Sequence, residues 1–357
     1  MKFYMPTKVY AENECVKNHG SELSSLGTHA LIVTGKNSSK KNHSLDDVLE
    51  VLEANSVNYT VFDNVEENPS VETVMDAREL GLENNADFVI GIGGGSPIDA
   101  AKAAALMLKN PHKPWQFLYE NTPSESLPLA AVPTTCGTGS EVTGVSVLTR
   151  HDLKTKVSAK HKIYPNLALI DGKYLIGAPR SIIVNTAIDA LSHLIESAVN
   201  TLADTYSDMT AYEGLRQWSR CRNIIVGKEE LNTENALTLM NSSALAGMSI
   251  AQTGTTIPHA LSYILTYRGN VPHGAAVGIF QPNYLRFAEK ELVNRVLTAA
   301  GFASLDEFDS FIHNLVPVSV DAKLLEDTAA SVLAKPDKLA LCPYKTDEKK
   351  MAELIKI

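Results

Sequence analysis

The stretch VIGIGGGSPIDAAKAAALML (residues 89–108) predicts a buried strand, a glycine turn and a helix, in that order. Gly93, Gly94 and Gly95 permit positive φ angles and let the backbone come close to a ligand. Ser96 can cap the helix, and Pro97 suits its first turn. Unpaired N–H groups at such a helix start attract anions, so the pyrophosphate of a dinucleotide fits this turn. The pattern departs from G-x-G-x-x-G because position 96 is serine, and a glycine-rich turn without a ligand is the alternative.

Strand-like and helical runs alternate on both sides of this stretch. The rhythm of strand and helix predicts βαβ units and a parallel sheet covered by helices. The expected strands are residues 30–35, 58–63, 86–93 and 127–133, with further β-like runs at 142–149, 154–159 and 166–171. The expected helices between them lie near residues 44–55, 70–85 and 97–109.

From about residue 180 the apolar residues recur at three- and four-residue spacing, which indicates helices, and few β-like runs remain. We therefore expect an α/β dinucleotide-binding domain over residues 1–178 and an all-helical domain over residues 179–357. The segment LIGAPRS (175–181) is a plausible hinge, and ligands often bind between such domains.

A second polar loop, PTTCGTGSE (133–141), follows an expected strand directly. The hydroxyl groups of Thr134, Thr135, Thr138 and Ser140 suit ribose and phosphate oxygens. Composition alone makes this a weak signal, since many such loops are similar.

Asp189 and His193 are candidate metal ligands in the helical half. They lie four residues apart in TAIDALSHLIES, so both side chains project from one helix face. His259 and His273 follow in IPHALSY and VPHGAA, each directly after a proline. Three imidazoles and a carboxylate suit Zn²⁺ or Fe²⁺. The alternative is a helix-surface pair and histidines whose hydrogen bonds are satisfied within the protein.

Composition excludes several function classes. The chain has 357 residues and a net charge of −9, which argues against a nucleic-acid or anionic-membrane partner. The four cysteines form no C-x-x-C pair and are expected to be reduced thiols. The N-terminus lacks an apolar signal region, and no apolar run reaches membrane-spanning length. A cytoplasmic location is the default expectation.

Four motifs in this order, GGGSPIDAAK, PTTCGTGSEVT, DALSH and two histidines with thirteen residues between them, resemble the iron-containing (group III) alcohol dehydrogenase family. The resemblance implies the fold shared with dehydroquinate synthase, with an N-terminal Rossmann-like α/β domain and an all-helical C-terminal domain. It further implies a divalent metal, Fe²⁺ or Zn²⁺, a homodimer, and NAD(P)-linked interconversion of alcohols, such as primary alcohols or diols, with aldehydes or ketones.

The resemblance also assigns residues. The metal ligands would be Asp189, His193, His259 and His273. The residues that would hold the nucleotide come from several segments: Gly94, Gly95, Ser96 and Asp99 at the pyrophosphate, Thr134, Thr135 and Thr138 along the cofactor, and Asn68, Val147, Lys156 and Leu175 where the family contacts the nucleotide.

The segment after the strand ALIVT departs from many NAD-using relatives, which place an acidic residue there for the adenosine ribose. Here that position is Gly35, followed by Lys36, Ser38 and Ser39 in a basic, hydroxyl-bearing loop. A carboxylate would repel a 2′-phosphate, whereas this loop leaves space and offers donors and charge. We therefore expect NADP(H) to be preferred over NAD(H); the alternative is a solvated basic loop.

Tyr263 replaces a histidine that many family members carry four residues after the first ligand histidine of this pair. A tyrosine titrates near ~10, so it is a poor base at neutral pH. It either orders a water in a proton relay or packs beside the metal helix.

Three other functions are compatible with the sequence. A lyase of the dehydroquinate-synthase type would need a basic pocket for a substrate phosphate, and the arginines of the helical half show no convergence. A glycerol-dehydrogenase-like zinc enzyme is the nearer alternative. A silent nucleotide-binding module is a third, but it would have no need for all four ligand types.

Overall fold

The computed structural model describes residues 1–357, which divide into two compact units. The α/β unit comprises Met5–Ala178 and Leu231–Ala244, and the helical unit comprises Met1–Tyr4, Pro179–Glu230 and Leu245–Ile357. Two segments thus differ from the expected division at residue 178. Met1–Tyr4 joins the helical unit, where the backbone of Tyr4 exchanges two hydrogen bonds with the side chain of Gln252. Leu231–Ala244 joins the α/β unit, where Ser243 Oγ accepts a hydrogen bond from Gly139 N.

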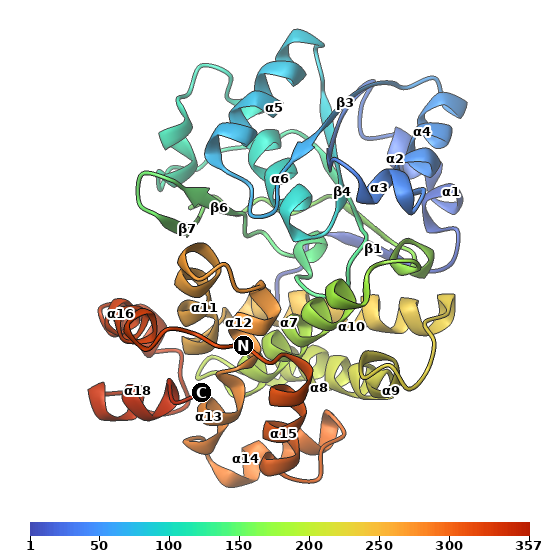
Figure 1. The fold of residues 1–357 in the computed structure, drawn as a ribbon. Helices are drawn as coiled ribbons and strands as arrows, with labels where there is room; N and C mark the ends of the chain where they lie inside the picture. Colours follow the sequence, from blue (N-terminus) through green and yellow to red (C-terminus); the bar gives the residue numbers. More distant parts are fainter. The chain divides into compact units, whose positions relative to one another are not determined.

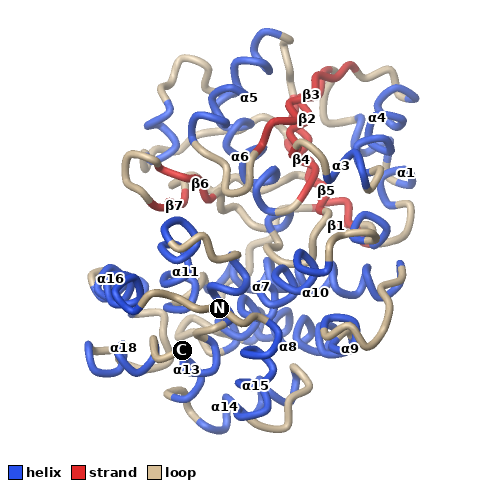
Figure 2. The backbone as a smooth tube through the Cα atoms, viewed as in Figure 1, coloured by secondary structure: helices blue, strands red, loops and turns tan.

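A six-stranded parallel sheet forms the centre of the α/β unit (Figures 1 and 2). Its strand order is β1-β8-β5-β4-β2-β3. The predicted parallel sheet is therefore confirmed. The strands are β1 (Lys8–Ala11), β2 (His29–Gly35), β3 (Asn58–Val65), β4 (Phe88–Gly93), β5 (Leu129–Pro133) and β8 (Leu167–Ile170). A separate antiparallel hairpin consists of β6 (Val147–Arg150) and β7 (Thr155–Ser158).

The expected β-like run 142–149 is not one strand. Its first part belongs to the 3₁₀ turn η2 (Ser140–Val142), and β6 begins only at Val147. Side chains, and not a neighbouring strand, bind the backbone here: Lys102 donates to the carbonyl of Val145, between the two elements, and Asp99 accepts from the N–H of Val147, where β6 begins. Strand β1 was not predicted. Its four residues lie at the edge of the sheet and are mostly half-buried, so their sequence lacks the alternation of apolar and polar residues that indicates a strand.

Helices cover both faces of the sheet, and each face has its own apolar core (Figure 1). One face packs against α5 (Val71–Glu83) and α6 (Gly95–Lys109), with Leu31, Val89 and Leu106 fully buried. The other face packs against α1 (Cys15–Asn18), α2 (Gly20–Ser24) and α4 (Ser44–Ala54). The remaining short elements of this unit are η1 (Trp115–Tyr119), α3 (Ser38–Lys41) and η3 (Gly172–Leu175).

The strand order determines where this unit can bind a ligand. Strand β2 lies between β3 and β4, so the chain reverses direction across the sheet after β3. In open parallel sheets ligands bind at the carboxyl ends of the strands where the order reverses. The loops after β2, β4 and β5 leave the same edge of the sheet, because these strands are parallel neighbours.

The helical unit contains no strand, as expected (Figure 2). Its core includes the fully buried Trp218, Tyr284, Phe280 and Phe308. None of the helices combines the length and the apolar character of a membrane span. The helices are α7 (Arg180–Ala198), α8 (Thr205–Arg220), α9 (Arg222–Ile225), α11 (Ile257–Arg268), α12 (His273–Gly278), α13 (Gln281–Arg286), α14 (Lys290–Ala299), α15 (Leu305–Leu315), α16 (Ala322–Leu333), α17 (Pro336–Leu339) and α18 (Glu348–Leu354), while α10 (Thr233–Thr253) is divided between the units.

Candidate metal centre and dinucleotide site

The four predicted metal ligands lie together in the helical unit. Asp189 and His193 project from one face of α7, one turn apart, His259 lies in the first turn of α11, and His273 begins α12. The Oδ1 atom of Asp189 lies 3.4 Å from His259 Nε2, 3.7 Å from His273 Nε2 and 3.8 Å from His193 Nδ1. A divalent ion binds such atoms at about 2.0–2.2 Å, so two ligand atoms lie at most about 4.4 Å apart. The separations from Asp189 meet this limit.

Burial and unsatisfied polar atoms support the fit to a cation. The ligand atoms of Asp189, His193 and His259 lie within 4.8 Å of one another, and all three residues are buried. Asp189 Oδ1 and His259 Nε2 are buried atoms without a hydrogen-bond partner. Native proteins rarely leave buried polar atoms unsatisfied. The donor set and its two unsatisfied atoms therefore fit a divalent metal of the Fe²⁺ or Zn²⁺ type.

The electrostatics of the cluster favour charge. Burial opposes ionisation of Asp189, but the histidines around it hold its pKa well below the usual range. Burial likewise opposes the charged form of His259, yet the carboxylates of Glu196 and Asp189 raise its pKa to about 9. A bound cation would take the place of the proton that these carboxylates attract.

Glu196 is a residue that the sequence reasoning missed. It lies on α7 seven residues after Asp189 and three after His193, so the three side chains share one helix face. Its side chain is fully buried and contacts His259 Nδ1 at 2.5 Å. The spacing of Asp189, His193 and Glu196 was a readable signal, because a glutamate in an otherwise apolar stretch rarely lies fully buried without a partner.

His273 reaches the cluster because α12 packs closely against α7. A Cβ atom on Gly274 would lie only 1.8 Å from the carbonyl oxygen of Asn185. The side chain of Asn185 also accepts a hydrogen bond from the N–H of Ala275. Only glycine at position 274 allows this approach, and His273 is the residue directly before it.

Tyr263 lies beside the cluster. Its ring stacks on that of His273, with the ring centroids 6.2 Å apart and an interplanar angle of 22°. The side chain of His273 is the most accessible of the three ligand histidines, at 26% exposed. The predicted Tyr263 is thus a neighbour of the centre, on the side of this histidine.

In the α/β unit, the two polar loops of the sequence meet at the carboxyl ends of β4 and β5. Gly93 ends β4 with a φ of 145°, and Gly94 precedes α6. A Cβ atom on Gly95 would lie 2.6 Å from Thr138 Cγ2, and one on Gly94 would lie 3.1 Å from Thr135. Positions 94 and 95 therefore require glycine partly because the loop that carries Thr135 and Thr138 packs directly against them. Thr134, also predicted, is buried beside them.

Hydrogen bonds link five more of the predicted cofactor residues. Asn68, in the left-handed region with a φ of 58°, donates from its N–H to Ser96 Oγ and accepts a hydrogen bond from Lys156 Nζ at its Oδ1. Asp99 accepts from the N–H of Val147 at 2.9 Å and from Ser140 Oγ at 2.5 Å. The four segments that carry these residues are thus held as one group. Lys102, not singled out from the sequence, is fully buried and ties Ser140, Thr143 and Val145 to α6.

Two predicted cofactor residues do not fit their roles. Ser39 is fully buried, and its hydroxyl accepts a hydrogen bond from Thr34 Oγ1 at 2.8 Å, so it is not available to a phosphate. Leu175 has no exposed surface. Ser39 belongs to a small buried group of hydrogen-bonded residues with Thr34 and Ser44, and the basic, hydroxyl-rich composition of the loop could not predict this burial.

The other residues of the loop after β2 remain accessible. Ser38 and Lys36 are exposed, and a Cβ atom on Gly35 would meet only the carbonyl of Val65, at 3.4 Å. Lys40 pairs with Asp63 at 2.6 Å, and Lys36 also helps to hold the pKa of Asp63 below its ordinary value. This loop therefore has space at Gly35 and a local excess of positive charge.

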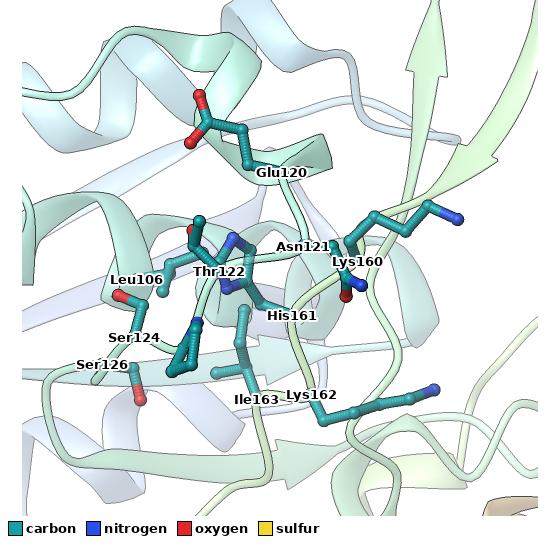
Figure 3. Close-up of a pocket in the computed structure, with 11 residues that line it drawn as sticks. Leu106, Glu120, Asn121, Thr122, Ser124, Ser126, Lys160, His161, Lys162 and Ile163 are labelled. Atoms are coloured by element: carbon teal, nitrogen blue, oxygen red, sulfur yellow. The ribbon is translucent and has the colours of Figure 1, made fainter.

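A further pocket of about 320 Å³ lies in the α/β unit. It is lined by the loops before β5 and β8, so it lies at the amino ends of these strands, opposite the edge that carries the glycine turn. The side chains of Lys160 and Lys162 point away from Thr122 and Ser124 (Figure 3). The polar groups do not converge, and we assign it no role.

Comparison with known proteins identifies the family. Residues 6–172 match the model of the iron-containing alcohol dehydrogenases, and residues 183–308 match that of the C-terminal domain of Fe-containing alcohol dehydrogenases. The chain is 30% identical to the NADPH-dependent butanol dehydrogenase of Clostridium saccharobutylicum, over 88% of this chain and 82% of that protein. It is 29% identical to the 1,3-propanediol dehydrogenase of Klebsiella pneumoniae, over 83% and 79% respectively.

Among solved structures, an iron-containing alcohol dehydrogenase from Thermotoga maritima is 36% identical, with a TM-score of 0.91 over 99% of this chain and 98% of that one. Both halves of the chain and nearly all of its fold are thus matched. The chain belongs to the iron-containing alcohol dehydrogenase family.

Proposed function

We propose that this alcohol dehydrogenase holds a divalent metal through Asp189, His193, His259 and His273 and uses NADP(H) in preference to NAD(H) to interconvert alcohols, such as primary alcohols or diols, with aldehydes or ketones. The observation that carries the proposal is the buried cluster around Asp189 Oδ1, with two polar atoms left unsatisfied. A bound divalent ion would supply Lewis-acid polarisation of the substrate oxygen. The nicotinamide would supply or accept the hydride.

The protein's own residues would then act by position and charge. The buried side chains of Asp189, His193 and His259, with the more accessible His273, would hold the cation in a part of the protein that bulk water does not reach from the side of α7. Gly94 and Gly95, pressed by Thr135 and Thr138, give the nucleotide a rigid backbone surface, and Asn68 and Lys156 are positioned by each other. Positioning the substrate beside the cofactor and preorganising the surrounding charges lower the activation barrier of hydride transfer, so no nucleophilic side chain is needed.

Tyr263 is proposed to pack against His273 and not to serve as a general base. Its stacked ring supports this role, and an ordinary tyrosine is protonated at neutral pH. We expect Tyr263→Phe to lower kcat less than about tenfold, because loss of a true general base costs about 10²–10⁴-fold. Steady-state rates across pH measure this. A hundredfold loss of kcat, together with the disappearance of one ionisation from the pH profile of kcat, would instead assign Tyr263 to the proton relay.

NADP(H) preference is proposed from the loop after β2. Space at Gly35 and the lysines beside Asp63 favour a 2′-phosphate, and one relative described above is NADPH-dependent. We expect kcat/KM to be at least about tenfold higher with NADPH, and Gly35→Asp to remove this advantage, because apposed like charges cost several kcal/mol. Paired kcat/KM measurements with both cofactors test this. A clear NADH preference of the unmodified enzyme would end the proposal.

The substrate is best sought by following NADPH oxidation over short aldehydes, ketones and dihydroxy compounds, with iron or zinc added back to metal-free protein. Net consumption of NADPH with an aldehyde also separates a dehydrogenase from a lyase that only borrows the hydride. A protein that binds the cofactor but oxidises none of it would instead be a silent nucleotide-binding module.

A further inference from the structure

Glu196 lies behind the metal cluster and is surrounded by hydrogen-bond donors. Its Oε2 accepts from the N–H of Thr256 at 2.6 Å and from the Thr256 hydroxyl at 2.8 Å. Its Oε1 accepts from Gln281 Nε2 at 2.9 Å and contacts His259 Nδ1 at 2.5 Å. All four residues are buried, with 2% exposure or less. An ionised carboxylate is an acceptor only, so this environment suits it.

The contact with Glu196 determines which nitrogen of His259 carries a proton. Because an ionised carboxylate cannot donate, His259 Nδ1 must donate to it. In a neutral imidazole the other nitrogen, Nε2, then has a free lone pair. Nε2 is the atom that faces Asp189 Oδ1 at 3.4 Å. The lone pair therefore points into the cluster where a cation would bind.

We propose that Glu196 is a positioning residue that fixes the ring and the tautomer of His259 so that Nε2 is held ready for the metal. The inference rests on the proposed metal centre and adds to it a residue outside the ligand set. Carboxylates behind a ligand histidine typically raise metal affinity by about 10–100-fold.

Glutamine at position 196 would reverse this arrangement without leaving a cavity. Its Oε1 could accept from both donors of Thr256, while its Nε2 would face His259 and Gln281. Gln281 has an Oε1 atom without a hydrogen-bond partner, so a flipped amide there could accept from the new NH₂ group. Every bond would be satisfied only if His259 Nδ1 became the acceptor. The proton would then move to Nε2 and block the metal.

The experiment compares metal affinity of the full-length protein and its variants. Metal-free wild type, Glu196→Gln, Glu196→Asp and Glu213→Gln are titrated with Zn²⁺ against a competing chelator, and Co²⁺ absorption spectra report the ligand field. The control residue, Glu213, is a partly exposed glutamate on α8 that pairs with Arg216 and Gln217. Melting of each metal-free protein shows whether the variants fold.

We expect Glu196→Gln to bind Zn²⁺ about 10–100-fold more weakly than wild type, with an altered Co²⁺ spectrum. Glu196→Asp keeps an acceptor, so it should lose less affinity than Glu196→Gln despite its shorter reach. Glu213→Gln should match wild type. The inference about Glu196 would be overturned if Glu196→Gln bound Zn²⁺ as tightly as wild type, or if Glu196→Asp bound Zn²⁺ more weakly than Glu196→Gln. Neither result would affect the proposed metal centre. Wild type without metal affinity would overturn the metal centre itself.

Discussion

Replacing His259 by alanine should lower turnover by at least about 10³-fold, because a Lewis-acid metal contributes several kcal/mol of transition-state stabilisation and each 1.36 kcal/mol is tenfold in rate. The side chain lies at the centre of the cluster, between Asp189 and Glu196, and is buried. Its loss would leave two buried carboxylates facing a void, so the metal should be lost with it. Affinity for NADPH should stay within about threefold, because the proposed nucleotide residues all belong to the α/β unit.

Metal content, single-turnover rate and NADPH binding, measured on one preparation, test this expectation. His273→Ala should behave similarly, although its more accessible side chain allows partial replacement by water. His313→Ala is the control, since this histidine is exposed on α15 and pairs with Asp309. Full activity of a metal-free His259→Ala or His273→Ala protein would contradict the proposed chemistry. A loss of NADPH binding in parallel with turnover would point to a general folding defect.

The sequence predicted the parts of the fold whose signals are local. Buried runs such as 86–93 alternate with amphipathic helices, and a strand–glycine–helix stretch has few other solutions. The candidate ligand set came from the resemblance of DALSH and of the two later histidines to the family, because the spacing of Asp189 and His193 alone also fits a helix-surface pair. Contacts that depend on packing could not be predicted. Ser39 has the composition of a phosphate ligand but is buried against Thr34, and Leu175 has no free surface.

The same limit explains why Glu196 and the segment Leu231–Ala244 were missed. The role of Glu196 depends on His259, 63 residues later, and on Gln281, 85 residues later. Leu231–Ala244 has the periodicity of the helical half but packs against Gly172 in the α/β unit. Helical periodicity reports which face of a helix is buried and not which neighbour buries it.

Gly274→Ala should be the most damaging single-methyl change near the metal centre. The new Cβ atom would lie 1.8 Å from the carbonyl oxygen of Asn185, a backbone atom that cannot rotate away. Overpacking a well-packed contact typically costs about 1–3 kcal/mol, and we expect about 3 kcal/mol or more here because one of the two helices must move. Such a shift displaces His273, and a metal site tolerates only about 0.5 Å. Chemical denaturation and Zn²⁺ titration of the variant measure both effects.

Gly278→Ala is the matched control, since it adds a methyl group on the same short helix toward the same neighbour. Its Cβ atom would lie 2.5 Å from Ile188 Cγ2, a side-chain methyl group and not a backbone atom, so small local shifts can relieve the clash without moving a whole helix. We expect it to lose about 1–2 kcal/mol of stability and to keep most of its Zn²⁺ affinity. The difference between the two variants isolates the backbone contact. If Gly274→Ala is as stable and binds Zn²⁺ as tightly as Gly278→Ala, the close approach of α12 to α7 does not position His273.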